Sequence, residues 1–447
     1  MILYKKCKIP IDYKKKTVIL NSSRRHFLLF CFRKAVVPML RLLKKIDTSY
    51  FQKENISFFF LNVIYFSANC MFFGFLVMYL TSKGYSGFEC GVFNTLISIC
   101  ALIVQPISGY LTDTFITIKK YLIFTSIAAI AFTFALPLTV SNPILAAISV
   151  MLMAALVNPS AFLADTWAVT LRETYPHIDY GKNRSGGSIG YCITSIAAGY
   201  LVAPLGYHIL FILHIVLFII YILIVLTIPD IPCRNAKSAQ PLSAEPSEHK
   251  SLSFIQVLNI LLKNKPYLLF LTSSFCYYAS MRAFSSNVSY KVLSLGGDDS
   301  MMGVALAIGA IFEVPFLFII NRCIHRFPLN HLYLFSVFCI LFRGLFMAFA
   351  PTAGLMYFSQ ALQACSYGVY VAVSLEIVSR LVPPNIRTTS ITLMVAVTSG
   401  LGAIIGCFIG GALIDSMGVD LMAYIMSIPC VVGILLYLIP MFQQKSK

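Results

Sequence analysis

Long apolar segments constrain this chain more than any other feature of its sequence. A helix needs roughly 20 apolar residues to cross the hydrocarbon core of a membrane, and twelve segments approach or exceed that length. They are 58–80, 88–112, 119–138, 143–171, 185–204, 208–229, 267–290, 300–321, 329–350, 353–379, 388–414 and 419–441. Charged residues make up only 11% of the chain, against about 25% in soluble proteins. The sequence therefore predicts an all-α membrane protein with twelve transmembrane helices.

The formal net charge of +17 follows the ends of these spans. Basic residues such as Lys119, Lys120 and Arg380 gather at the ends that an even number of spans puts on one side of the membrane, whereas the opposite loops hold few, Lys83 and Lys291 among them. Cytoplasmic loops carry an excess of Lys and Arg. Both termini are therefore predicted to be cytoplasmic, and the charge does not indicate a nucleic-acid partner.

The spans divide into two groups of six. The polar, Pro- and Ser-rich segment 230–266 has the composition of a linker, and it separates a bundle at 56–229 from a bundle at 267–447. A G-x-L-x4-G pattern occurs at 199–206 and again at 411–418 (411 − 199 = 212), which predicts two copies of one six-helix unit in the same orientation. Residues 1–55 are predicted to be a basic extension at the cytoplasmic face, unless Met39 is the true start.

Cysteine and nucleotide-binding motifs give little support to other functional classes. Thirteen cysteines include no C-x-x-C pair and have no histidine at metal-binding spacing, so neither a disulfide framework nor a metal site is predicted. No G-x-x-x-x-G-K-[ST] loop is present, which argues against ATP coupling. No cofactor is predicted.

The segment LADTWAVTLRETYPHIDYGKNRSGGSIGY, residues 163–191, carries the most specific motif. Its order of residues is Asp165, Tyr180-Gly181, Arg184, Gly187-Ser188 and Tyr191. In this order the segment resembles the region of the fourth and fifth helices in major facilitator superfamily transporters related to lactose permease. It is more similar still to the phenylpropionic acid permease-like (MFS_1-like) branch. The resemblance extends from Phe58 to the carboxyl end, and it implies the major facilitator fold, in which two six-helix pseudo-repeats surround a central cavity.

The resemblance also implies a substrate site. It predicts that Arg184 donates to substrate hydroxyls or a carboxylate, that Asp165 accepts from hydroxyls and that Tyr191 stacks on a ring. The residues expected to contact substrate are Asp165, Arg184, Ser188, Tyr191, Tyr277 and Gln363. The residues alone leave a second interpretation, because Asp165 lies roughly 30 Å along its span by helix rise, where it and Arg184 could be gate charges. Arg282 is expected either to border the cavity or to extend toward the membrane surface.

Proton coupling is assigned to an acid and a base deep in the membrane. Glu313 and Arg343 lie near the middle of spans eight and nine, where this lineage places embedded charges, and buried charges usually face a cavity or a partner. An ion pair or a protonation switch between them is expected; the alternative is a static pair that only holds helices together. Span ten departs from the pattern of lactose permease. Where lactose permease has a proton-coupling His and Glu, this sequence has Gln363 and Ser366.

Gate and packing residues are predicted from shorter motifs. Asp113 ends QPISGYLTD, which resembles the superfamily's loop after the second helix, and Glu376 is predicted to pair with Arg380 one turn later as a gate. G-x-x-x-G faces at Gly186 and Gly190, and at 402–410, predict close helix packing. The resemblance to the superfamily implies that helices five and eight, and two and eleven, line the seam between the halves, so these glycine faces could also allow sliding.

Three functional classes compete. The favoured one is a secondary transporter that moves a sugar, nucleoside or aromatic acid with a proton by alternating access, as a monomer in the bacterial inner membrane. A drug/proton antiporter is the alternative, although span five lacks the Gly-Pro step typical of that class. A membrane-embedded enzyme would need a convergent cluster of acid, histidine or nucleophile, and this is the least favoured class.

Overall fold

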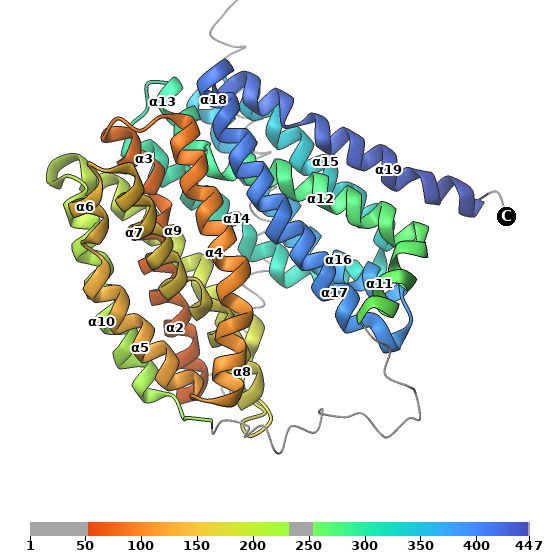
Figure 1. The fold of residues 1–447 in the computed structure, drawn as a ribbon, viewed down its shortest axis with the longest axis horizontal. Coiled ribbons are helices and arrows are strands. Elements are labelled where there is room, and N and C mark those ends of the chain that lie inside the picture. The colour runs from red at the N-terminus through yellow and green to blue at the C-terminus, as the bar shows by residue number, and fades with distance from the viewer. Residues whose placement is uncertain (1–51, 232–253, 446–447) are drawn as a thin grey trace, which may run out of the picture. The chain divides into compact units, whose positions relative to one another are not determined.

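The computed structural model describes residues 52–231 and 254–445. Within these two ranges the chain forms helices and contains no strand (Figure 1). The helices belong to one structural unit that starts at Lys53. Most of the predicted extension 1–55 and of the predicted linker 230–266 lies outside the described residues.

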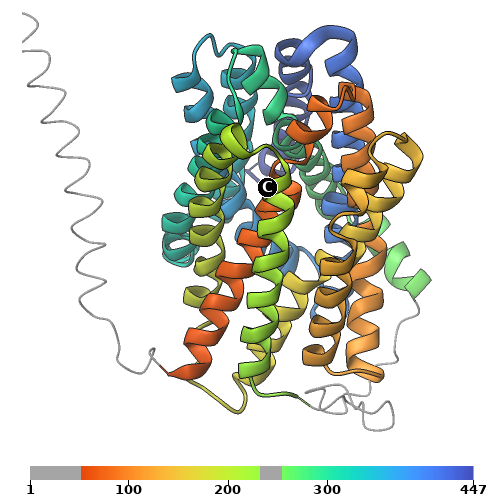
Figure 2. The same ribbon diagram turned by 90° about the vertical axis from the view of Figure 1, so that its left-hand side faces the viewer.

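The first six predicted spans form an amino-terminal half, in which the helices run side by side (Figure 2). The π-helical segment η2 interrupts the first span, and single-residue breaks or short turns interrupt the third and fourth. The bounds are α2 Lys53–Asn69, η2 Cys70–Gly74, α3 Leu76–Ser82, α4 Gly87–Thr114, α5 Ile118–Phe132, α6 Ala135–Thr139, α7 Pro143–Val157, α8 Pro159–Leu171, α9 Tyr180–Leu205 and α10 His208–Thr227.

The last six predicted spans form a carboxyl-terminal half. It is preceded by a short helix, α11, inside the segment that the sequence predicts as a linker. The bounds are α11 Phe254–Lys263, α12 Lys265–Ser286, α13 Val288–Ser294, α14 Asp299–Arg326, α15 Leu329–Ala348, α16 Ala353–Leu381, η3 Pro384–Ile386, α17 Arg387–Val395, the π-helical η4 Ala396–Gly402, α18 Ala403–Ile425 and α19 Ile428–Lys445.

Polar side chains fix where several helices begin. Ser86 and Glu89 form a capping box at the start of α4, and the side chain of Asp179 accepts from the backbone N–H of Lys182 at the start of α9. Such caps satisfy backbone N–H groups that have no partner in the first turn of a helix.

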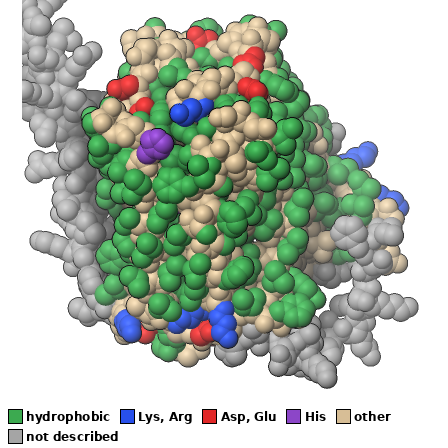
Figure 3. Space-filling view, turned by 60° about the vertical axis from the view of Figure 1, so that its left-hand side comes forward, with side chains coloured by type: hydrophobic (Ala, Val, Ile, Leu, Met, Phe, Trp, Pro, Cys, Tyr) green, Lys and Arg blue, Asp and Glu red, His purple; other side chains and the backbone are tan. Residues whose placement is uncertain are grey.

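Ten described stretches are long and apolar enough to cross a membrane. One of them, Arg387–Ile439, covers the last two predicted spans. The predicted span 267–290 becomes α12 and α13, and α12 is not among these ten stretches. On the face shown in Figure 3, apolar side chains form a broad belt between two charged ends. The prediction of a twelve-helix membrane protein is confirmed.

Four turns reveal the internal repeat in the backbone. Gly84, Gly206, Gly296 and Gly418 have φ values from 70° to 91°, a region that favours glycine because it has no Cβ. The two pairs share one offset (296 − 84 = 212; 418 − 206 = 212), which is the offset of the G-x-L-x4-G repeat. We call the end of the helices that carries these turns the turn end, and the opposite end, with residues 115–117 and 382–386, the linker end.

Two helix pairs form the seam between the halves, as expected: α9 packs on α14, and α4 packs on α18. The backbones meet at glycines, since a Cβ on Gly91 would lie 2.8 Å from the Cα of Gly411, and a Cβ on Gly303 would overlap the carbonyl oxygen of Ser195. Bringing backbones this close requires small residues.

The predicted G-x-x-x-G faces lie elsewhere. Gly186 and Gly190 pack on the α2 backbone at Phe59 and Val63, within the amino-terminal half, while Gly406 packs on the backbone of Ala279 in α12. These glycines therefore hold each half together. The expectation that they form a sliding surface between the halves is wrong.

Candidate functional site

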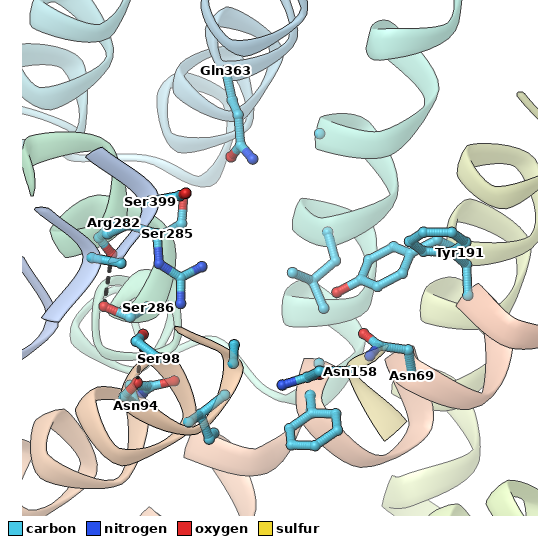
Figure 4. Close-up of a pocket in the computed structure, with 18 of the residues that line it drawn as sticks. Asn69, Asn94, Ser98, Asn158, Tyr191, Arg282, Ser285, Ser286, Gln363 and Ser399 are labelled. Atoms are coloured by element: carbon cyan, nitrogen blue, oxygen red, sulfur yellow. Dashed lines mark hydrogen bonds between the residues drawn. The ribbon is translucent and has the colours of Figure 1, made fainter. Parts of the chain in front are cut away.

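A cavity of about 710 Å³ lies between the two halves. Both π-helical segments border it, through Phe73 and Gly74 of η2 and through Ala396, Ser399 and Gly400 of η4. π-Helical turns inside α-helices are frequent at functional sites. Side chains from both halves point into the open space (Figure 4).

Arg184 lies on the wall of this cavity, in the second turn of α9. Its Nε lies 3.7 Å from Oδ2 of Asp165 on α8, and its guanidinium lies 4.3 Å from the ring centre of Phe66 on α2. Tyr180 contacts both charged side chains. A guanidinium over an aromatic face gains a cation–π attraction, so Arg184 is held by a carboxylate and by a ring that the sequence did not single out.

Glu313 approaches the same arginine from the other half. It lies on α14, borders the cavity, and faces the Arg184 guanidinium and the Ser188 hydroxyl. Arg184 thus pairs with an acid of its own half, Asp165, and its charge also acts on an acid of the opposite half, with which it forms no ion pair in the described residues. Among the described residues, Glu313 is the one carboxylate that lines the cavity.

Amide side chains form the amino-terminal wall. Asn69, Asn94 and Asn158 line the cavity in this half, and Figure 4 shows Asn69 and Asn158 near Tyr191. Asn158 occupies the break between α7 and α8, directly before Pro159. The predicted span 143–171 is one continuous apolar stretch, but a proline removes a backbone hydrogen bond inside a helix, and the amide directly before this proline lines the cavity. An N-P step inside an apolar run was the available signal.

The residues predicted to contact substrate fall into two groups. Arg184, Ser188, Tyr191 and Gln363 line the cavity, and Asp165 joins it through Arg184. Tyr277 does not belong there. Its hydroxyl lies 2.7 Å from Oγ of Ser366 and its ring stacks on Tyr370 at 4.2 Å, fully buried inside the carboxyl-terminal half.

The expected ion pair between Glu313 and Arg343 is also absent from the described residues. Arg343 is fully buried, and it donates to Oγ of Ser285 at 3.0 Å and to Oε1 of Gln360 at 3.2 Å. Its helix, α15, packs on α16 inside the carboxyl-terminal half, whereas Glu313 faces the other half. Ser285 and Gln360 border the cavity, so Arg343 lies behind its wall.

The predicted gate residues lie toward the linker end. Glu376 and Arg380 form the expected pair within α16, with 2.9 Å between Oε1 of Glu376 and Nη2 of Arg380. Asp113, near the end of α4, is exposed. None of the three pairs with a described residue of the opposite half, so their role as a gate stays a prediction.

Contacts that the sequence analysis missed join the halves at the turn end. Asp415 of α18 accepts from the backbone N–H groups of Gly87 and Phe88 at the start of α4, at 2.6 and 2.9 Å. The Tyr207 hydroxyl donates to Oδ1 of Asp299 at 2.8 Å. The unpaired N–H groups at a helix start attract a carboxylate. The DSMG tail of the G-x-L-x4-G repeat contained this acid, but its partner is a backbone that the sequence could not identify.

Comparison with known proteins agrees with this architecture. The sequence profile of the MFS_1 like family matches residues 55–425. The chain is 27% identical over 384 residues to the maltose permease of Geobacillus stearothermophilus, which covers 86% of this chain and 92% of that protein. It is 25% identical over 361 residues to the putative nucleoside transporter YegT of Escherichia coli (strain K12), covering 76% and 80%.

Solved structures confirm the predicted fold. The nucleoside transporter NupG superposes with a TM-score of 0.71 at 18% identity, covering 89% of this chain and 100% of that chain. The D-xylose-proton symporter superposes with a TM-score of 0.63 at 11% identity, covering 86% and 96%.

Proposed function

The chain belongs to the MFS_1 like family of major facilitator transporters, and from this premise we propose that it carries a small polar solute together with a proton by alternating access. It is a multi-pass membrane transporter rather than an enzyme. Its relatives include proteins named for maltose, nucleoside and xylose transport. The proposed solute classes are a sugar, a nucleoside or an aromatic acid.

Arg184 and Glu313 line the same cavity from opposite halves, and Arg184 also pairs with Asp165; this arrangement supports the proposal most strongly. One arginine cannot pair fully with two acids from different halves. In our proposal, a proton on Glu313 removes its charge and frees Arg184 for Asp165 and for the solute. Loss of that proton restores the attraction between Glu313 and Arg184 across the seam. Solute binding is thereby linked to proton binding.

The remaining site residues have proposed roles as well. Ser188, Tyr191 and Gln363 are proposed to contact the solute, because they line the cavity beside Arg184. Arg343 is proposed to support this site from behind by holding Ser285 and Gln360 in place.

The proposed location is the bacterial inner membrane, with both termini cytoplasmic and the protein acting as a monomer. This orientation follows from the basic residues of the linker end. The hydrogen bonds of Asp415 and Tyr207 close the turn end, so the described conformation would face the cytoplasm. Asp113, Glu376 and Arg380 are proposed to close the linker end in the opposite conformation.

The test compares two activities of Glu313→Gln in proteoliposomes. Glutamine mimics the protonated acid, so we expect uptake driven by a proton gradient to fail while exchange of solute at equilibrium persists. Wild type performs both. Loss of both activities in a correctly inserted variant would reduce Glu313 to a binding or structural role. Retention of both would contradict proton coupling through Glu313.

A further inference from the structure

A second arginine, Arg282, faces the cavity from the carboxyl-terminal half. It lies on α12 and lines the cavity, and Figure 4 shows its guanidinium across the open space from Tyr191 and Asn158. Its Nε is buried and has no hydrogen-bond partner. The sequence analysis left open whether Arg282 borders the cavity or extends to the membrane surface, and the structure places it in the cavity.

No described carboxylate pairs with Arg282. The groups that face it are the thiol of Cys407 and the phenols of Tyr278 and Tyr367. Arg343, behind the same wall, likewise bonds to the neutral side chains of Ser285 and Gln360. The acids near the cavity, Asp165 and Glu313, face Arg184 instead. The carboxyl-terminal wall therefore carries positive charge that the described side chains do not balance.

An unbalanced cation inside a membrane protein is costly and usually marks a substrate or ion pathway. Arginine offers five N–H donors and no acceptor, and its planar fork matches a carboxylate through two parallel hydrogen bonds. A neutral hydroxyl would accept from fewer of these donors and would leave the positive charge of the guanidinium unbalanced. The opposite wall differs, because the amides of Asn69, Asn94 and Asn158 both donate and accept, which suits hydroxyls and ring heteroatoms.

We propose that Arg282 binds a carboxylate of the transported solute, so that the substrate is a small organic acid whose hydroxylated or aromatic part lies toward Asn158 and Tyr191. This rests on the proposed transport function and narrows its solute classes to acids. The negative charge of the solute neutralises the positive charge of the carboxyl-terminal wall that the described side chains leave unbalanced.

The experiment uses matched solutes that differ in one group. Purified full-length protein is heated with D-glucuronate or D-glucose, and with 3-phenylpropionate or 3-phenylpropanol, and the shift of its melting temperature is measured at millimolar solute. Acids that stabilise the protein are then tested for exchange in proteoliposomes. We expect at least one acid to stabilise wild type and to be exchanged, while its neutral counterpart does neither.

Variants assign the effect to Arg282. Arg282→Gln should weaken acid binding by about ten- to a hundredfold, the loss expected for hydrogen bonds to a charged group, and Arg282→Lys should retain part of the affinity. Arg326→Gln, which removes an exposed charge at the end of α14, should bind as wild type does. Melting temperatures without solute identify any variant that misfolds.

The outcomes separate the two proposals. If only neutral solutes bind and exchange, or if Arg282→Gln binds the acid as wild type does, the inference about Arg282 is wrong while the transport proposal stands. If no solute of either kind binds or exchanges, the inference about Arg282 is wrong, while the transport proposal still includes nucleosides, which this panel does not contain.

Discussion

The carboxylate of Asp415 lies 2.6 Å from the backbone N–H nitrogen of Gly87 and joins α18 of one half to the first turn of α4 in the other. A second bond, from the N–H of Phe88, uses the other carboxylate oxygen. The helix start binds this acid without any basic side chain, because its N–H groups have no partners within the helix.

Weakening this contact should open the turn end. We expect Asp415→Asn to expose the cavity from that side, since charge-assisted hydrogen bonds contribute about 1.5–3 kcal/mol. The measurement is the labelling rate of a cysteine introduced at Ser289, which borders the cavity, by a membrane-impermeant reagent in a cysteine-depleted background. A rise of about tenfold or more is expected.

Asp420→Asn is the matched control for that variant. Asp420 pairs with Lys291 at 2.6 Å within the carboxyl-terminal half, so its loss should not separate the halves. Equal labelling in the two variants would show that the Asp415 contact does not hold the turn end closed.

Arg184→Lys should retain insertion but lose most transport. Lysine keeps the charge and lacks the planar fork that can bridge Asp165, Glu313 and the solute, so uptake should fall by about tenfold or more. Arg172→Lys, at an exposed position after α8, serves as the control. Uptake close to that of wild type in Arg184→Lys would make Arg184 a gate or topology charge.

Substitutions at Tyr277 and Gln363 should have different effects, the first on the stability of the protein and the second on solute binding. Tyr277→Phe removes the hydroxyl bonded to Ser366, so it should lower stability by about 1 kcal/mol and leave KM unchanged. Gln363→Ala should raise KM and leave the melting temperature unchanged, because this side chain faces the cavity. A higher KM in Tyr277→Phe would return Tyr277 to the substrate site.

Protease access tests the orientation of the chain. Residues 234–250 are polar and Pro-rich in sequence, and such segments are preferred cleavage sites. We expect limited proteolysis to cut there in inside-out vesicles. Cutting that occurs only from the outer face of intact cells would invert the proposed topology.

Hydropathy predicted the helices well because each span must be apolar along its whole length, and the offset of 212 predicted the repeat that the positive-φ glycines display. Side-chain partners were harder. The depth of Glu313 and Arg343 along their helices was correct in outline, but depth does not give the rotation of a helix about its axis. Arg343 faces its own half and Glu313 faces the other.

The unknown rotation of a helix about its axis also explains why the sequence analysis misplaced Tyr277 and left the position of Arg282 open. They lie five residues apart on α12, more than one turn, and they point to different surroundings. Tyr277 points into the core, and Arg282 points into the cavity. Which of the two faces the cavity depends on how α12 packs against its neighbours, and a single sequence does not contain that information.

The glycine contacts of the seam give the two halves a fulcrum. Gly91 meets Gly411, and Gly303 meets the backbone at Ser195, all in the parts of their helices nearer the turn end. The part of α9 between Ser195 and its start at Tyr180 makes a lever of roughly 23 Å at 1.5 Å per residue, so a tilt of about 10° around this fulcrum would move the tip at Tyr180 by about 4 Å. In the proposed alternating access, a small rotation at the glycines would therefore move the cavity mouth by several ångströms without any helix changing its own conformation.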